Sequence, residues 1–271
     1  MSKKFKLGVV GNPIEHSLSP FIHSRFARHE NINLEYQAYK VEKDNFNNFV
    51  SDFFTNPNAK GLNITLPFKS MASKINGKIS EEAKYINAVN TITKFQNSLS
   101  LETTDGSGFM RDLEINNIKV AGKNILIIGA GAAVESILYK LVLDNPNSIT
   151  ILNRSQDKAD KLQNRYVEQK KISSALPANK SFDLVINGSS AGLTGDFKAP
   201  GDIQISNKTS FYDLNYSLDT TPFCDWAPNN SSLVYDGIGM LVNQASISFQ
   251  LWFDVVPETK KVLEEIKSLK E

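Results

Sequence analysis

Hydrophobic and polar positions along this chain follow two patterns, short apolar runs and apolar residues at helical spacing. The short runs predict strands at 7–11, 61–65, 87–94, 99–104, 125–128, 149–152, 183–187, 211–214 and 233–235. Helical spacing predicts helices over 46–54 and 134–142, one from about Met240, and a last one marked by Val262, Ile266 and Leu269. Strands that alternate with helices in this way are typical of α/β architecture.

The clearest unit is a strand-helix-strand segment. Ile125–Ile128 is a continuous apolar run, as expected for a strand covered on both faces of a parallel sheet. Gly129-Ala130-Gly131 follows it. In a dinucleotide-binding turn the first glycine permits the tight turn, the second lets the backbone approach a pyrophosphate, and the helix start supplies free N–H groups. Val134 stands at the third glycine position, which predicts a helix held slightly off the sheet. A plain structural turn is the simpler alternative.

The end of the second strand bears on which dinucleotide would bind. An NAD site usually has Asp or Glu there, whereas this chain has Asn153-Arg154-Ser155, with Lys158 one helical turn later. A guanidinium can bind a 2′-phosphate in bidentate fashion, and Ser155 begins a helix whose N–H groups add a second anion contact. The pattern predicts NADP preference, against the simpler interpretation of a solvated basic helix start.

Composition excludes several classes of protein. The 271 residues are 41% apolar and 22% charged, with a formal net charge of +1, so nothing favours nucleic acid or an anionic membrane as partner. No apolar run is long enough to span a bilayer or to serve as a secretory signal.

Cysteine and histidine usage argues against disulfides and metal. Cys224 is the single cysteine, which excludes an internal disulfide and suits a cytoplasmic setting. The histidines, His16, His23 and His29, lie in one short segment without other metal-ligand types nearby. We expect no metal site.

Two residues predict proton transfer beside the dinucleotide site. Lys69 ends the segment Asn63-Ile64-Thr65-Leu66-Pro67-Phe68-Lys69, and Asp105 lies in Thr104-Asp105-Gly106. Hydride delivered to a ketone carbon leaves negative charge on oxygen. A lysine ammonium can stabilise that charge and donate the proton, while a carboxylate orients the lysine and favours its charged form. Taken alone, Lys69 is more simply interpreted as a surface lysine.

A serine pair follows the first strand. Ser17-Leu18-Ser19 places two hydroxyls two residues apart, so an extended loop would present both on one side. They suit a small polar anion or polyol, and they suit turn or helix-cap positions equally well.

These segments form an ordered series. The series is Asn-Pro-Ile-x-His-Ser-x-Ser-Pro, Asn-x-Thr-x-Pro-Phe-Lys, Ala-Val-Asn-Thr, Thr-Asp-Gly, Gly-Ala-Gly, Asn-Arg-Ser and Asp-Gly-Ile-Gly-Met-Leu-Val-x-Gln-Ala, between Gly11 and Trp252. In this order and at this spacing the chain resembles the shikimate dehydrogenase family and its quinate-using relatives.

The resemblance implies a role for each matching residue. Lys69 and Asp105 match the catalytic pair, and Ser17 and Ser19 match hydroxyls that hold the substrate carboxylate. Further substrate-binding residues implied in this way are Thr65, Asn90 and Gln244 for the ring hydroxyls and Tyr216 near the carboxylate. The implied NADP site comprises Gly129, Ala130, Gly131, Ala132, Ala133, Asn153, Arg154, Ser155, Lys158 and Gly237.

The resemblance also implies the architecture and the reaction. We expect an N-terminal α/β substrate domain, 1–105 with 238–271, a Rossmann-like NADP domain, 106–237, and a cleft between them. Family members interconvert 3-dehydroshikimate and shikimate with NADP in chorismate and aromatic amino acid biosynthesis. The expected partners are these small molecules, and the expected assembly is a monomer or a homodimer.

Three alternatives stay open. The first is quinate as substrate. Both serines favour shikimate, because quinate-using relatives often differ at the second hydroxyl. The absence of an acidic residue at Asn153 also favours shikimate, because many quinate-using relatives accept NAD. A methylenetetrahydrofolate dehydrogenase also uses a lysine, but the Ser-Leu-Ser and Asp-Gly-Ile-Gly-Met segments argue against it. The third is a shikimate-binding homologue with impaired catalysis.

Three positions depart from the family pattern. Thr103 replaces an asparagine and offers one hydroxyl where an amide is usual. Ala132 adds a methyl group in the glycine turn, which would crowd a pyrophosphate. Glu135 stands where many relatives have arginine, an unfavourable charge near a diphosphate unless it points to solvent or pairs with a base. We expect cofactor binding weaker than is typical.

Overall fold

The chain forms two compact units, each with its own sheet. The computed structural model describes residues 3–169, 171–178, 181–189, 197–198, 203–227 and 231–269. The first unit comprises Met1–Gly108 and Val242–Ile266, and the second comprises Phe109–Leu241 and Lys267–Glu271. The predicted domains differ from these units by a few residues, because α5 (Asp105–Ile115) and α9 (Ile238–Phe253) contribute to both units.

The sheet of the first unit is mixed. Within the described residues its strand order is β2-β1-β3-β5-β6-β4. Strands β1 and β2, β1 and β3, and β4 and β6 pair in parallel, while β5 is antiparallel to β3 and β6. The strands are β1 (Phe5–Gly11), β2 (Leu34–Lys40), β3 (Ala59–Ile64), β4 (Lys78–Ile79), β5 (Thr91–Phe95) and β6 (Ser98–Glu102).

Helices cover both faces of this sheet. The helical elements are α1 (Ser19–His29), a short 3-10 turn (Lys43–Asn45), α2 (Phe46–Thr55), α3 (Lys69–Ala72), α4 (Glu81–Ile86) and α10 (Thr259–Lys267), together with parts of α5 and α9. Val10 and Leu62 belong to the core under α2, whereas Leu7 and Val9 pack with Trp252 of α9. Alternate strand residues therefore face opposite layers.

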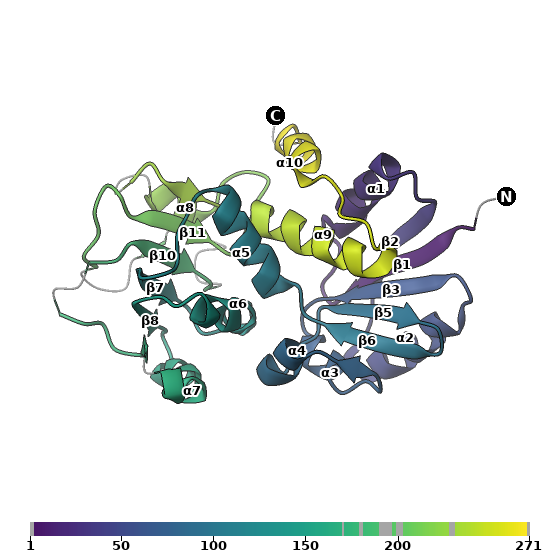
Figure 1. Ribbon diagram of the computed structural model, residues 1–271, viewed down its shortest axis with the longest axis horizontal. Coiled ribbons are helices and arrows are strands. Elements are labelled where there is room, and N and C mark those ends of the chain that lie inside the picture. The colour runs from purple at the N-terminus through teal and green to yellow at the C-terminus, as the bar shows by residue number, and fades with distance from the viewer. Residues whose placement is uncertain are drawn as a thin grey trace. The chain divides into compact units, whose positions relative to one another are not determined.

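The sheet of the second unit is parallel throughout its described strands. Its order is β12-β11-β10-β7-β8-β9. The strands are β7 (Asn124–Ile128), β8 (Ser148–Leu152), β9 (Ile172–Ser173), β10 (Leu184–Asn187), β11 (Ser210–Asp213) and β12 (Val234–Tyr235). The helical elements are α6 (Ala132–Leu143), α7 (Gln156–Arg165), a 3-10 turn (Val167–Gln169) and α8 (Pro222–Trp226) (Figure 1).

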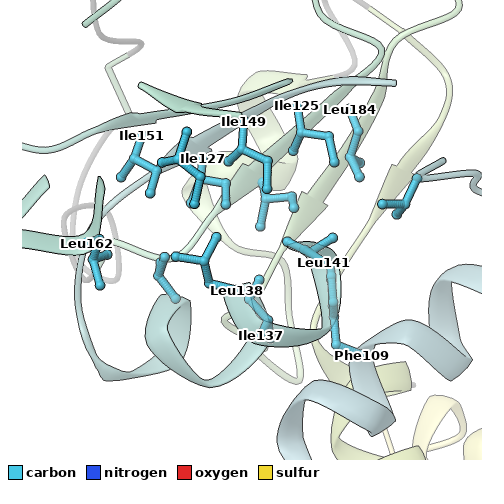
Figure 2. Close-up of a cluster of buried hydrophobic side chains, with 14 of the residues drawn as sticks. Phe109, Ile125, Ile127, Ile137, Leu138, Leu141, Ile149, Ile151, Leu162 and Leu184 are labelled. Carbon is cyan, nitrogen blue, oxygen red and sulfur yellow. The ribbon is translucent and has the colours of Figure 1, made fainter. Parts of the chain in front are cut away.

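Strand β7 lies in the middle of that sheet and is covered on both faces, as its apolar run predicts. Ile125 and Ile127 face α6, where Figure 2 shows them opposite Ile137, Leu138 and Leu141. Leu126 and Ile128 instead join the core with Phe223 of α8. The α/β fold class is confirmed.

Several predicted element boundaries are wrong. The strand expected over 87–94 begins at Thr91, because α4 runs to Ile86 and Asn87 ends it in the left-handed conformation, with φ 55° and ψ 42°. The strand expected over 99–104 ends at Glu102, because Asp105 begins α5. The helix expected from about Met240 begins at Ile238.

Candidate functional site

Two neighbouring parallel strands bring the predicted substrate residues to one edge of the first sheet. Strands β1 and β3 end side by side, and the segments with Ser17 and Thr65 follow them. Gly11 has no room for a side chain, since a Cβ there would lie 2.5 Å from Cγ2 of Thr65. The glycine at the end of β1 therefore makes the space that Thr65 occupies.

The predicted catalytic pair is formed within the first unit. Lys69 begins α3 and Asp105 begins α5, and Nζ of the lysine lies 2.7 Å from Oδ2 of the carboxylate. The side chains are 19% and 10% exposed. A contact this short between partly buried groups holds the ammonium in one place more firmly than a surface ion pair would.

Asn90 holds the other oxygen of the carboxylate. Its Nδ2 donates to Asp105 Oδ1 at 2.9 Å. Its Oδ1 accepts from the backbone N–H of Thr104 at 2.9 Å and from the Thr91 hydroxyl at 2.8 Å, which determines which way the amide faces. The same Nδ2 lies 3.3 Å from Oε1 of Gln244. Four predicted residues, Lys69, Asn90, Asp105 and Gln244, are therefore in one hydrogen-bonded group.

A buried chain of hydrogen-bonded residues contacts this group through Thr91, and its members were not predicted as site residues. Tyr36 donates its hydroxyl proton to Asn63 Oδ1 at 2.7 Å. Nδ2 of Asn63 donates to the Thr91 hydroxyl at 3.1 Å and to the Ser248 hydroxyl at 3.0 Å. The available signal was polar residues within apolar elements: Asn63 interrupts β3, and Ser248 interrupts α9.

Gln244 is positioned by close contact between two helices. A Cβ at Gly108 of α5 would lie 2.5 Å from the backbone nitrogen of Gln244 and 2.6 Å from its Cβ. Only a residue without a side chain allows α5 and α9 to approach this closely. The glycine three residues after Asp105 thus determines where Gln244 stands relative to the catalytic pair.

The serine pair lies at the start of α1. The backbone N–H of Ser19 donates to the Ser17 hydroxyl oxygen at 3.3 Å, so the two predicted carboxylate ligands are adjacent. Ser17 is partly exposed and Ser19 is buried. The N-cap residue of α1 is Leu18, which has no side-chain cap, and the bond from Ser19 to Ser17 is the local turn contact that the sequence left open as the simpler role.

Thr103 gives Asp105 no side-chain support. Its hydroxyl is buried and has no hydrogen-bond partner among the described residues. Asn90 supports the Asp105 carboxylate instead, by donating from Nδ2 to Oδ1.

In the second unit, the glycine turn lies where the strand order changes direction. It follows β7, which has β8 on one side and β10 on the other. Gly129 has a φ of 112°, and a Cβ there would lie 2.7 Å from the backbone of Gly188, which follows β10. In open α/β sheets, ligands bind outside the carboxyl ends of strands at such a switch point.

The start of α6 is open to an anion. Gly131 is the residue before the helix, no side chain caps it, and a Cβ built on it would meet nothing within 4 Å. The predicted residues Gly131, Ala132 and Ala133 are exposed, while Gly129 and Ala130 are buried. Val134 finds its space at Gly188, where a Cβ would lie 2.4 Å from Cγ2 of the valine. Gly188, in the loop after β10, thus leaves room for the valine side chain at the position where the usual turn has its third glycine.

The basic residues after β8 are available for a phosphate. Asn153 donates from Nδ2 to the carbonyl of Ser155 at 2.9 Å, which shapes the turn before α7. Arg154 and Lys158 are exposed, and neither forms an ion pair within the described part of the chain. The donor set, a free guanidinium and ammonium beside an uncapped helix start, fits a 2′-phosphate.

Glu135 does not face a diphosphate site as a free charge. Arg165 Nη1 lies 3.2 Å from its Oε2, so the carboxylate is paired with a base. Pairing with a base is one of the two conditions under which Glu135 is compatible with a bound diphosphate.

The remaining two predicted residues lie near the end of β11. Gly237 is buried, and a Cβ on it would lie 2.5 Å from the carbonyl oxygen of Leu214, which gives it a packing role. Tyr216 is partly buried in the loop after β11, and burial raises the pKa of its hydroxyl. It belongs to the second unit, whereas the other predicted substrate residues belong to the first.

A second buried carboxylate orders that loop and was not predicted. Asp213 is the last residue of β11, and burial raises its pKa even though four hydrogen-bond donors oppose the shift. Its Oδ1 accepts from Asn187 and Asn215, both at 2.9 Å, and its Oδ2 accepts from Thr221 at 2.6 Å. An acidic residue within a predicted buried strand was the available signal.

The described residues hold neither a metal cluster nor a membrane-spanning helix. They contain no group of three or more His, Cys, Asp and Glu side chains arranged to hold a metal ion. None of their helices has the length and apolar character needed to span a membrane.

Three family models match separate segments of the chain. Residues 9–92 match the family model "Shikimate dehydrogenase substrate binding domain", residues 113–194 match "Shikimate / quinate 5-dehydrogenase", and residues 237–267 match "Shikimate 5'-dehydrogenase C-terminal domain". These regions contain most of the residues predicted from the motif series.

Individual relatives cover almost the whole chain. The shikimate dehydrogenase (NADP(+)) of Hahella chejuensis is 40% identical over 94% of this chain and 96% of its own. The crystal structure of an Ael1 enzyme from Pseudomonas putida is 35% identical, with a TM-score of 0.87 over 97% of this chain and 98% of that one. Shikimate 5-dehydrogenase from Thermus thermophilus, solved with NADP(H) and shikimate, is 25% identical, with a TM-score of 0.86 over 98% and 100%.

The predicted family is therefore confirmed by segments that together span both units. Each motif of the predicted series lies on a described element or loop, and relatives at 36–40% identity cover at least 94% of the chain. The chain belongs to the shikimate dehydrogenase family.

Proposed function

We propose that this protein catalyses the reversible NADP-dependent interconversion of 3-dehydroshikimate and shikimate, with Lys69 and Asp105 as the proton-transfer pair. The observation that carries the proposal is the 2.7 Å contact between Nζ of Lys69 and Oδ2 of Asp105 in a chain of this family. NADPH, when bound, supplies the hydride.

Lys69 performs the proton chemistry in this proposal. Its ammonium donates a hydrogen bond to the carbonyl oxygen of the substrate, stabilises the negative charge that develops there, and gives up a proton to it. In the oxidation direction the neutral amine accepts the proton of the substrate hydroxyl. An ammonium has three N–H donors, and Asp105 takes one of them, so donors remain for the substrate.

The neighbouring residues bind and orient the ring. Ser17 and Ser19 hold the carboxylate with their hydroxyls, and Thr65, Asn90 and Gln244 hold the ring hydroxyls. Tyr216 lies near the carboxylate in this assignment. Support comes from the position of Thr65 beside the end of β1 and from the contact of Asn90 with both Asp105 and Gln244.

The NADP site is proposed on the second unit. Gly129–Ala133 would receive the pyrophosphate at the start of α6, and Asn153, Arg154, Ser155 and Lys158 would hold the 2′-phosphate. Gly237 keeps its predicted place in this site. Support comes from the start of α6, which no side chain caps, and from the Arg154 guanidinium, which forms no ion pair with the residues that the structure describes. The units at 1–108 with 242–266 and at 109–241 thus take the substrate and cofactor roles.

The partners in this proposal are small molecules. Assembly as a monomer or a homodimer and a cytoplasmic location stay predictions from the sequence.

The test is a spectrophotometric assay of NADP+ reduction with shikimate and then with quinate. We expect turnover with shikimate, and Lys69→Ala to lower kcat by about 100- to 10,000-fold, the range of general acid-base catalysis. Lys69→Arg keeps the charge but does not release a proton, so it should bind shikimate and remain equally slow. Lys84→Ala, an exposed lysine of the same unit, is the matched control.

Two outcomes would contradict the proposal. A folded Lys69→Ala variant with kcat within about tenfold of the parent would remove the acid-base role from this residue. Turnover with quinate and none with shikimate would assign a different substrate to the same site.

A further inference from the structure

A cavity in the first unit lies outside the proposed catalytic group. It has a volume of about 880 Å³ and is bounded by α2, the α3 segment and the turn between β5 and β6. These elements lie in one unit (Figure 1). None of Ser17, Ser19, Thr65, Asn90 or Gln244 lines this cavity.

The lining combines apolar side chains with two lysines. Val50, Phe54, Met71, Ile75 and Leu99 supply the apolar surface. Lys74 and Lys94 are the charged residues of the lining, and none of its members, all of them described, is acidic. In a chain with 30 basic and 29 acidic residues, a lining with cations alone favours an anionic occupant.

The two ammonium groups are not neutralised by carboxylates in the described part of the chain. Lys74 forms no ion pair there. Lys94 Nζ donates to the carbonyl oxygens of Phe54 at 2.7 Å and Asn56 at 3.3 Å, at the end of α2. Two of its three N–H donors are thus used, and one remains.

We propose that this cavity binds a small aryl carboxylate. The carboxylate would face Lys74 and the free donor of Lys94, and the aromatic ring would pack against Phe54 and Met71. Aromatic rings and thioethers both make favourable contacts with an aromatic ring, which selects a flat body over a simple aliphatic acid.

The occupant would contact the helix that carries Lys69. Met71 follows Lys69 by two residues in α3, and two residues turn a helix by about 200°, so their side chains point in nearly opposite directions. The segment is tightly held, since Lys74 N–H donates to Met71 O at 3.0 Å and Val89 N–H donates to Lys69 O at 3.0 Å. A ligand against Met71 therefore acts on the reverse side of the catalytic helix, and the cavity is an effector site.

The test is calorimetric titration of the full chain with 3-phenylpropionate in saturating shikimate, which blocks the proposed carboxylate ligands of the substrate site. We expect one-to-one binding, with the neutral 3-phenylpropanamide about tenfold weaker. Lys74→Gln should weaken binding about three- to fivefold, the scale of one exposed charge pair. Ser51→Trp, an exposed lining position on α2, should block binding by filling the cavity.

Lys84→Gln is the matched control, because this lysine is also exposed and lies outside the cavity. A second readout is turnover at saturating substrates, which saturating 3-phenylpropionate should change at least about twofold in the parent and not in Ser51→Trp.

Three results would overturn the site: no binding to the parent, equal binding of the acid and the amide, or loss of binding whenever shikimate is present. Binding that leaves turnover unchanged would overturn the effector role.

Discussion

Asp105 has two carboxylate oxygens, and each has its own partner. Oδ2 accepts a hydrogen bond from Lys69, and Oδ1 accepts one from Asn90. Because Asn90 is itself oriented by Thr91 and by the backbone of Thr104, the carboxylate has little freedom to rotate. The lysine is thus presented by a chain of hydrogen bonds and not by one ion pair alone.

Cofactor choice rests on Arg154 in our proposal. Arg154→Asp replaces a free guanidinium with a carboxylate that repels a 2′-phosphate, so KM for NADPH should rise about tenfold to a hundredfold. KM for NADH should change little, because NADH has no such phosphate. The measurement is KM for both cofactors, with Lys161→Asp, exposed on α7, as control. An equal rise for both cofactors would refute the assignment.

His23 makes the first unit sensitive to acid. Its ring is fully buried and stacked 4.3 Å from that of Tyr36, and burial lowers its pKa to about 3 from 6.5. Between pH 6.5 and about 3, the His23 ring binds a proton in the unfolded chain but not in the folded chain. The stability that is fully present above pH 6.5 is therefore lost progressively as the pH falls toward 3. The loss is about 1.4 kcal/mol per pH unit, or about 2 kcal/mol at pH 5.

Urea unfolding at pH 7 and pH 5 measures this effect. In the parent, the free energy of unfolding should fall more between these pH values than in His23→Phe, which has no proton to bind. His16→Gln, at an exposed position, should behave as the parent does. Identical pH dependence in the parent and in His23→Phe would show that another group is responsible.

At the scale of elements, α9 combines apolar packing with two polar contributions one turn apart. Gln244 reaches Asn90, and Ser248 reaches Asn63 and Thr91. The Ser248 hydroxyl also donates to the carbonyl oxygen of Gln244 at 3.1 Å. The helix is thereby joined to β3 and β5 in the register that brings Gln244 to Asn90 and the proposed catalytic pair.

Ser248→Ala should therefore affect both stability and substrate binding. The substitution removes one hydrogen-bond partner from each of the buried side chains Asn63 and Thr91, which should lower the free energy of unfolding by about 1–3 kcal/mol. KM for shikimate should rise several-fold, while the KM for NADP+ stays unchanged. Thermal unfolding and steady-state kinetics measure these effects, with Gln250→Ala, exposed on the same helix, as control. An unchanged KM for shikimate would limit Ser248 to a structural role.

Helical spacing predicted α2, α6, α9 and α10, because one apolar stripe per helix is a local property, but it missed α5. Strand ends were predicted less well. Asn87 looked like the start of a strand, yet it closes α4 in the left-handed conformation. The short strands β4 and β9, of two residues each, carry too few side chains for any pattern. β2 was also missed, although Leu34, Tyr36 and Ala38 alternate along it.

At the scale of the whole molecule, each unit has its own hydrophobic core on both sides of its sheet. The net charge of +1 adds no broad electrostatic preference to either the substrate or the cofactor role. In our proposal, specific recognition therefore comes from individual side chains after the carboxyl ends of the strands, such as Arg154 and the Ser17 to Ser19 segment.

The sequence by itself determined the family, the α/β class and the positions of Lys69 and Asp105, because motif order and local spacing are written along the chain. Only the tertiary structure decided which groups meet. It paired Glu135 with Arg165, left the Thr103 hydroxyl without a partner among the described residues, and let Gly188 make room for Val134. These contacts join residues 30 to 60 positions apart or depend on what surrounds a buried atom, and no local pattern records either.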